Sequence, residues 1–98
     1  MNQIYQTRLF CSDTATLDNL MAEGWQAELE KEHEVSFSPG EPAEITSKWT
    51  NPIREIRLMS KEYPALTFTA EFTCTTDDNP VTHVLEFANG NEREVYQR

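Results

Sequence analysis

Residues 65–75, ALTFTAEFTCT, carry the strongest structural signal in the chain. Apolar residues alternate strictly with threonine or glutamate, which is the two-residue period of a strand with one buried face. The β-branched and aromatic residues favour the same structure. We therefore expect a long strand whose apolar face lies in the core and whose threonine-rich face meets water. The residues predicted to point inward are Leu66, Phe68, Ala70, Phe72 and Cys74.

A hairpin is expected on the C-terminal side of this strand. Residues 76–80, TDDNP, have the composition of a turn. Residues 81–88 are expected to form a second strand that runs back beside the first. Asn89-Gly90 is a strong hairpin signal, so a last strand should run from about Glu92 to Tyr96. The inward side chains of the returning strand are predicted to be Val81, Leu85 and Phe87.

A helix is expected on the N-terminal side. Thr50 or Asn51 can cap it, and Pro52 is tolerated in a first turn because its missing donor would be unpaired there. Pro64 prevents the helix from continuing. Its apolar stripe consists of Ile53, Ile56 and Met59, whereas Leu58 falls on the opposite side, among Arg54, Arg57 and Lys61.

The first half of the chain predicts a strand over residues 3–11 and a helix that begins after Ser12 or Asp13. Gly24 is expected to end that helix, with Trp25 packing back on its end. The acid-rich segment from Glu23 to Glu34 is interpreted as a solvated tail of the helix or a loop. Two short strands should follow, containing Val35 and Phe37, and Ile45, Ser47 and Trp49.

This order, β-α-β-β-α-β followed by a further β-hairpin, predicts an α+β fold of the ferredoxin-like class. We expect one domain over residues 1–98, with an antiparallel sheet and two helices on one of its faces. The chain length allows only one hydrophobic core.

Composition excludes several classes of protein. The 98 residues carry 8 Lys and Arg against 17 Asp and Glu, a net charge of -9, which argues against direct binding to nucleic acid. No apolar stretch is long enough to span a membrane, and the N-terminus lacks a signal-peptide pattern, so we expect a cytoplasmic protein with no membrane partner. The two cysteines, Cys11 and Cys74, are expected to be buried thiols.

The residues that could support catalysis are few. We interpret His33, inside an acidic run, as a solvated side chain, and His83 as a hydrogen-bonded residue at the edge of the core. Asp77 and Asp78 fit turn chemistry better than paired catalytic carboxylates. The glycines are too few for a phosphate-binding loop. We therefore predict no enzymatic activity, no cofactor and no bound metal.

Residues 45–72, ITSKWTNPIREIRLMSKEYPALTFTAEF, resemble the YubB-type ferredoxin-like domain family of plasmid and phage proteins, whose function is unknown. The features that match are Trp49, Pro52, Ile56, Met59-Ser60 and Tyr63-Pro64. The matching residues are structural in type, and Asn51 stands where the family often has a proline. The resemblance implies a bacterial mobile element or its phage as the source.

Two functional hypotheses follow. The first is an acidic inhibitor or adaptor that binds a protein with a basic surface, such as an anti-CRISPR or anti-restriction factor that blocks the nucleic-acid-binding surface of a host defence complex. The alternative is a self-associating structural module, such as a homodimer, whose charge serves only solubility. The predicted partner-binding residues are an acidic group, Glu23, Glu28, Glu30, Glu32 and Glu34, and a separate contact made by Arg54, Arg57, Leu58 and Lys61.

Overall fold

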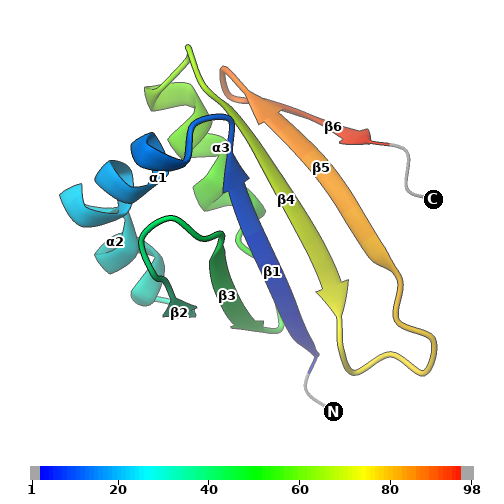
Figure 1. Cartoon of the computed structure of the whole chain (residues 1–98). Helices are drawn as coiled ribbons and strands as arrows, with labels where there is room; N and C mark the ends of the chain where they lie inside the picture. Colours follow the sequence, from blue (N-terminus) through cyan, green and yellow to red (C-terminus); the bar gives the residue numbers. More distant parts are fainter. Residues whose placement is uncertain (1–2, 96–98) are drawn as a thin grey trace.

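The protein is an α+β structure in which helices pack on one face of a six-stranded antiparallel sheet (Figure 1). The computed structural model describes residues 3–95. The strands follow the order β2-β3-β1-β4-β5-β6 across the sheet. The strands are β1 (Ile4–Cys11), β2 (Glu34–Ser36), β3 (Ala43–Lys48), β4 (Thr67–Cys74), β5 (Thr82–Ala88) and β6 (Asn91–Val95), and the helical elements are α1 (Thr14–Leu20), η1 (Met21–Trp25), α2 (Gln26–Glu30) and α3 (Ile53–Glu62).

Strand β1 lies at the centre, between β3 and β4. It is antiparallel to both, and Leu9 faces Ala43 on one side and Ala70 on the other. The first helical region connects β1 to β2, and α3 connects β3 to β4, so that the chain crosses over the same face of the sheet twice. The α+β class predicted from the sequence is confirmed, and the arrangement is consistent with the predicted ferredoxin-like order.

Strand β4 has the alternating burial that its sequence predicts. Phe68, Ala70 and Phe72 are buried, while Thr69 and Glu71 between them are partly exposed. The Thr73 hydroxyl lies 2.7 Å from that of Thr82 on β5, a polar contact on the outer face of the sheet. The prediction of an inward apolar face and an outer threonine face is therefore correct.

The first helical region does not end at Gly24, where the sequence predicts its end. The side chain of Asp13 caps α1 by accepting a hydrogen bond from the Ala15 amide, but the chain does not leave the helix at Gly24. Instead, Gly24 has a φ of 140° and kinks the chain, which continues as α2 to Glu30. A side chain would be strained at this φ. The segment after Gly24 is thus helical, and its Leu29 is fully buried rather than part of a solvated tail.

Helix α3 packs Ile56 and Met59 into the core and leaves Leu58 50% exposed, as the helical spacing predicts. The Asn51 side chain accepts a hydrogen bond from the Ile53 amide at 3.3 Å and so caps the helix. At the other end, the Ser60 hydroxyl accepts a hydrogen bond from the amide of Gly90 at 2.9 Å, which joins α3 to the turn between β5 and β6.

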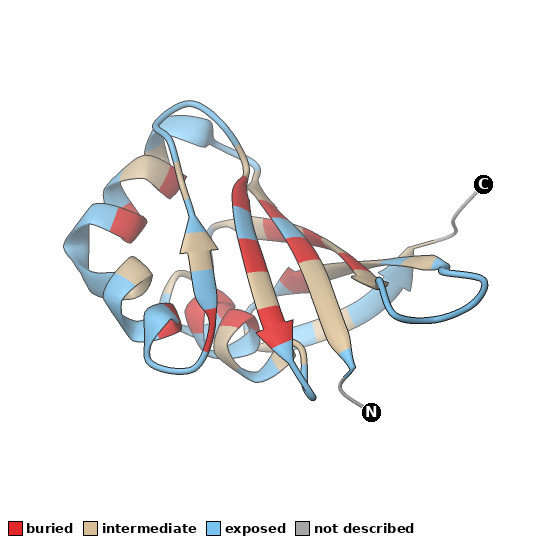
Figure 2. Ribbon diagram, turned by 90° about the horizontal axis from the view of Figure 1, so that it is seen from below, coloured by how far each residue is buried: buried red, intermediate tan, exposed pale blue. Residues whose placement is uncertain are grey.

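The core lies between the helices and the sheet, where buried residues from both layers meet (Figure 2). Several residues predicted to point inward are not fully buried, and of these Leu66 and Leu85 pack partly against the core. Trp49 and Val81 are each 59% exposed, since Trp49 leaves β3 with a positive φ of 73° and Val81 precedes β5. Cys74, like Cys11, is a free thiol that is partly exposed, because both lie at strand ends that the helices do not fully cover.

Strands β5 and β6 pair in an antiparallel register that places Glu86 opposite Arg93. The predicted last residue of the final strand, Tyr96, lies outside the described residues. Within residues 3–95, no helix is both long enough and apolar enough to cross a bilayer.

Candidate functional site

A groove separates the kinked helical region from α3. One wall comes from Glu23, Gly24, Trp25 and Glu28, and the other from α3 and the residue that follows it. The space has a volume of about 510 Å³. Because Gly24 turns the chain between Glu23 and Glu28, both carboxylates border the same groove. The residues of the second wall are Leu58, Glu62 and Tyr63.

The groove is lined by both apolar and acidic side chains. Leu58 is half exposed, and Trp25 and Tyr63 pack partly against the core. Among the described residues, Glu23 and Glu62 have no salt-bridge partner, and Glu28 lies 3.0 Å from Lys31. This exposed ion pair is weak, so a basic group of a partner can replace Lys31 beside Glu28. The groove therefore offers negative charge around an apolar contact surface, and we call it the acidic groove.

The acidic group predicted from residues 23–34 divides into two. Glu23 and Glu28 border the acidic groove, whereas Glu30, Glu32 and Glu34 border a second hollow of about 480 Å³ beside β3. Lys31 and Lys48 also line this second hollow, so its charge is mixed.

The predicted basic contact is also divided. Arg54 lies 3.4 Å from Glu32 and Arg57 donates to Glu92 at 2.6 Å, so both guanidinium groups have acidic partners. Lys61 packs beside Gly90 at the β5–β6 turn. Leu58 shares its groove with glutamates, a grouping that the spacing within α3 alone did not indicate.

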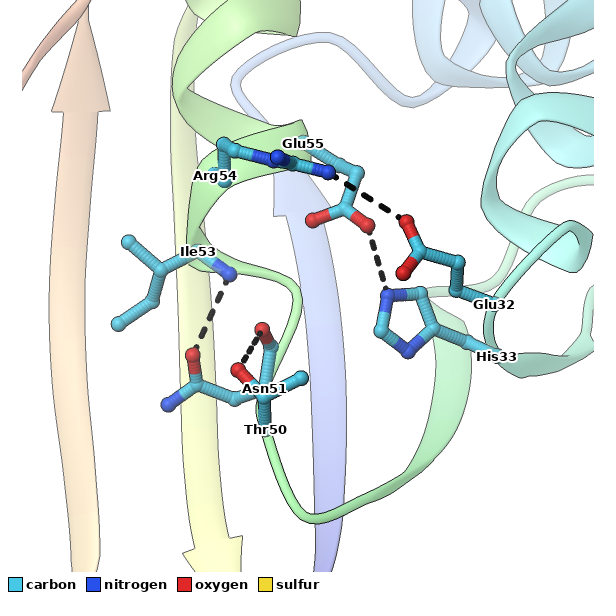
Figure 3. A network of polar contacts seen from close by, with 7 residues as sticks. All are labelled: Glu32, His33, Thr50, Asn51, Ile53, Arg54 and Glu55. Carbon is cyan, nitrogen blue, oxygen red and sulfur yellow. Dashed lines mark hydrogen bonds and ion pairs between the residues drawn. The ribbon is translucent and has the colours of Figure 1, made fainter.

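His33 is buried, which corrects its interpretation as a solvated residue. Its side chain is 2% exposed, and Nε2 lies 2.8 Å from the Glu55 carboxylate, which is 12% exposed (Figure 3). A carboxylate only accepts hydrogen bonds, so Nε2–H is the donor. Within the described part of the chain, Nδ1 has no hydrogen-bond partner. The burial follows from position, because His33 directly precedes β2 and its alternation with Val35 turns the ring toward the helix-covered face.

The His33–Glu55 contact and the Arg54–Glu32 contact lie side by side (Figure 3). Both connect the end of the kinked helical region to the first turn of α3. They lie near the N-terminal end of α3, whereas the acidic groove reaches Tyr63 beyond its C-terminal end. The two contacts therefore join the two walls of the groove from outside the groove itself.

His83 forms its predicted hydrogen bond but is exposed, not at the edge of the core. Its Nδ1 lies 3.1 Å from the Glu94 carboxylate, and both side chains are more than half exposed. The register is as expected, with His83 opposite Phe72, but this end of β5 runs past the helices (Figure 1). Asp77 and Asp78 lie in the β4–β5 turn. No cluster of three metal-binding side chains occurs within residues 3–95.

Other carboxylates occupy the outer face of the sheet. Glu71 pairs with Arg8 at 3.6 Å and Glu86 with Arg93 at 2.8 Å. The negative charge is thus spread over more than one face, and in the acidic groove it lies beside the exposed side chain of Leu58.

Comparisons with protein-family models, with curated proteins and with solved structures found no match to this chain.

Proposed function

We propose that the chain is a non-enzymatic protein-binding module that holds a basic segment of its partner in the acidic groove. The observation that carries this proposal is the grouping of Glu23, Glu28 and Glu62 around the exposed Leu58. An apolar contact gives affinity once water is excluded, and surrounding carboxylates select lysine- or arginine-rich segments and accelerate encounter.

The distribution of charge favours electrostatic steering over full imitation of DNA. Duplex DNA carries one charge per about 1.7 Å, so a face of 28 Å, the middle dimension of this molecule, would need about 16 negative charges. The whole chain has a net charge of -9, and its carboxylates lie on several faces. A groove that binds a basic surface element needs far fewer charges.

The partner class that fits this chemistry is a nucleic-acid-binding protein with a basic surface. We propose an inhibitor or adaptor from a plasmid or phage, of the anti-CRISPR or anti-restriction kind, that acts in the bacterial cytoplasm. In the same proposal, β1 to β4 with their helices form a ferredoxin-like unit, to which β5 and β6 are an addition. The negative charge of the chain and the sequence resemblance over residues 45–72 support this assignment.

The test compares two charge-reversal variants with equal net charge. The groove variant is Glu23→Lys, Glu28→Lys, Glu62→Lys. The control reverses three exposed glutamates around β2 and β3 that have no salt-bridge partner among the described residues, Glu34, Glu41 and Glu44. Tagged proteins are used to capture partners from nuclease-treated lysates of bacteria that express defence systems.

The wild type and the control variant should capture a nucleic-acid-binding protein, and the groove variant should bind it at least tenfold more weakly. Added DNA or RNA should compete with the wild type for the captured protein. Capture of no such protein, or an equal loss in both variants, would contradict the proposal. Light scattering on the same samples tests self-association, because a homodimer shows a concentration-dependent mass.

A further inference from the structure

At the end of the sheet opposite the β5–β6 turn, β1, β4 and β5 run past the helices (Figure 1). The side chains at this end line a cavity of about 490 Å³. Its apolar lining comes from four elements: Tyr5 on β1, Ile53 on α3, Phe72 on β4 and Leu85 on β5. Phe72 is buried and the other three are partly buried. This combination of volume and lining is typical of small-molecule sites.

The rim of the cavity is polar and acidic. Glu94 on β6 contributes a carboxylate that His83 contacts through one oxygen, at 3.1 Å, and Asp77 contributes a second carboxylate from the β4–β5 turn. Among the described residues that line the cavity, none is a lysine or an arginine. Val81 adds an exposed apolar edge. The floor thus favours an apolar body, and the rim favours a cation.

The N-terminal end of α3, which lies nearby, does not reverse the preference of the rim for a cation. A free helix N-terminus attracts anions through its unpaired amides. Here the Asn51 side chain, which also lines the cavity, accepts the hydrogen bond of the Ile53 amide. The remaining ionisable groups on the rim are the two carboxylates and the imidazole that contacts one of them.

We propose that this cavity binds a free small molecule that has an apolar, ring-sized body and a primary ammonium group. The body lies on Phe72 and Leu85, and the ammonium group donates hydrogen bonds to the carboxylates of Glu94 and Asp77. This site is separate from the acidic groove, since the two share no lining residue. It goes beyond the proposed partner binding and does not depend on it.

The test is a titration of the full chain with 2-phenylethylamine at pH 8, where an imidazole in water is uncharged. Backbone amide shifts in NMR should change saturably around Phe72 and Leu85, with a Kd on the order of 1 mM for a ligand of nine non-hydrogen atoms. The matched anion, 3-phenylpropanoate, should bind at least tenfold more weakly. Glu94→Gln should weaken the amine about two- to fivefold, as expected for an exposed charge contact.

Glu44→Gln is the control, since Glu44 lies on the outer face of β3 and should leave the Kd unchanged. In a Cys11→Ser background, saturating amine should also slow alkylation of Cys74, which lines the cavity. Equal binding of amine and anion, shifts located elsewhere, or an unchanged Kd in Glu94→Gln would overturn the proposal. Tighter binding of Nα-acetyl-lysine methylamide than of 2-phenylethylamine would assign the cavity to a partner's lysine side chain and overturn the free-ligand assignment.

Discussion

Replacing Glu55 by alanine should destabilise the protein much more than replacing an exposed glutamate of the same helix. The carboxylate of Glu55 is the only hydrogen-bond partner of the His33 ring among the described residues, and the His33 side chain is 2% exposed. Its removal leaves both ring nitrogens buried and unpaired. An unsatisfied buried polar group costs about 1–3 kcal/mol.

We expect Glu55→Ala to lower the free energy of unfolding by about 2 kcal/mol, in the middle of this range, because the His33 ring is buried whereas Glu55 itself is 12% exposed. For a domain of this size, the change corresponds to a decrease in Tm of about 8–16 °C. Urea and thermal unfolding followed by circular dichroism measure both quantities. Glu62→Ala, in the last turn of α3, should change stability by less than about 0.5 kcal/mol.

A double-mutant cycle separates the contact from other effects of the substitution. With His33→Ala and Glu55→Ala as the single variants, the coupling energy should be about 1.5–3 kcal/mol, the range for a hydrogen bond to a charged group. A coupling below about 0.5 kcal/mol, with Glu55→Ala no worse than Glu62→Ala, would refute the reasoning. His33 would then be the solvated side chain that its acidic sequence context predicts.

Three further substitutions test the fold. Gly24→Ala should cost about 1–2 kcal/mol, because a side chain is strained at a φ of 140°, and chemical denaturation should show no such loss for Ala22→Ser in the same segment. Leu29→Ala should cost about 2–5 kcal/mol if the segment after Gly24 is packed, whereas a solvated tail would lose less than about 0.5 kcal/mol. Ser60→Ala should cost about 1 kcal/mol and speed hydrogen exchange at the Gly90 amide, and an unchanged exchange rate would contradict the 2.9 Å hydrogen bond between them.

The sheet was the most predictable part of the molecule, because its signals are local. The alternation in residues 65–75 identifies both faces of β4 without any knowledge of its neighbours. The capping residue Asp13 and the apolar stripe of α3 are equally local, since a cap acts within three residues and a helical stripe repeats within four. These elements follow from patterns that a single segment contains.

Gly24 shows where a local signal has two outcomes. A glycine with positive φ commonly ends a helix, but it can also kink one that continues. Leu29 decides between them in this chain, because its burial against the core requires another helical turn. That contact depends on α2 lying over the sheet, which no window of sequence around Gly24 contains.

The two histidines have environments opposite to those predicted, for a related reason: His33 is buried and His83 is exposed. His33 is surrounded in sequence by charged residues, yet its position before β2 directs the ring into the core. His83 has the register of an inward residue, yet no helix extends over that end of β5. The length of α3 relative to the strands sets which inward positions are covered, and this is a property of the assembled layers.

The acidic groove is also a property of the assembled layers and not of one segment of sequence. Successive helical residues are separated by 100°, so Glu28 and Glu30 on α2 point to different sides and cannot form one patch. Glu62, far along the chain on α3, instead lines the same groove as Glu23 and Glu28, from the opposite wall. Net charge therefore determines only the long-range attraction of the molecule for basic partners, which salt screens. The position of Leu58 among those three glutamates is what gives the surface a preferred place of contact, and it arises from packing of the two helices.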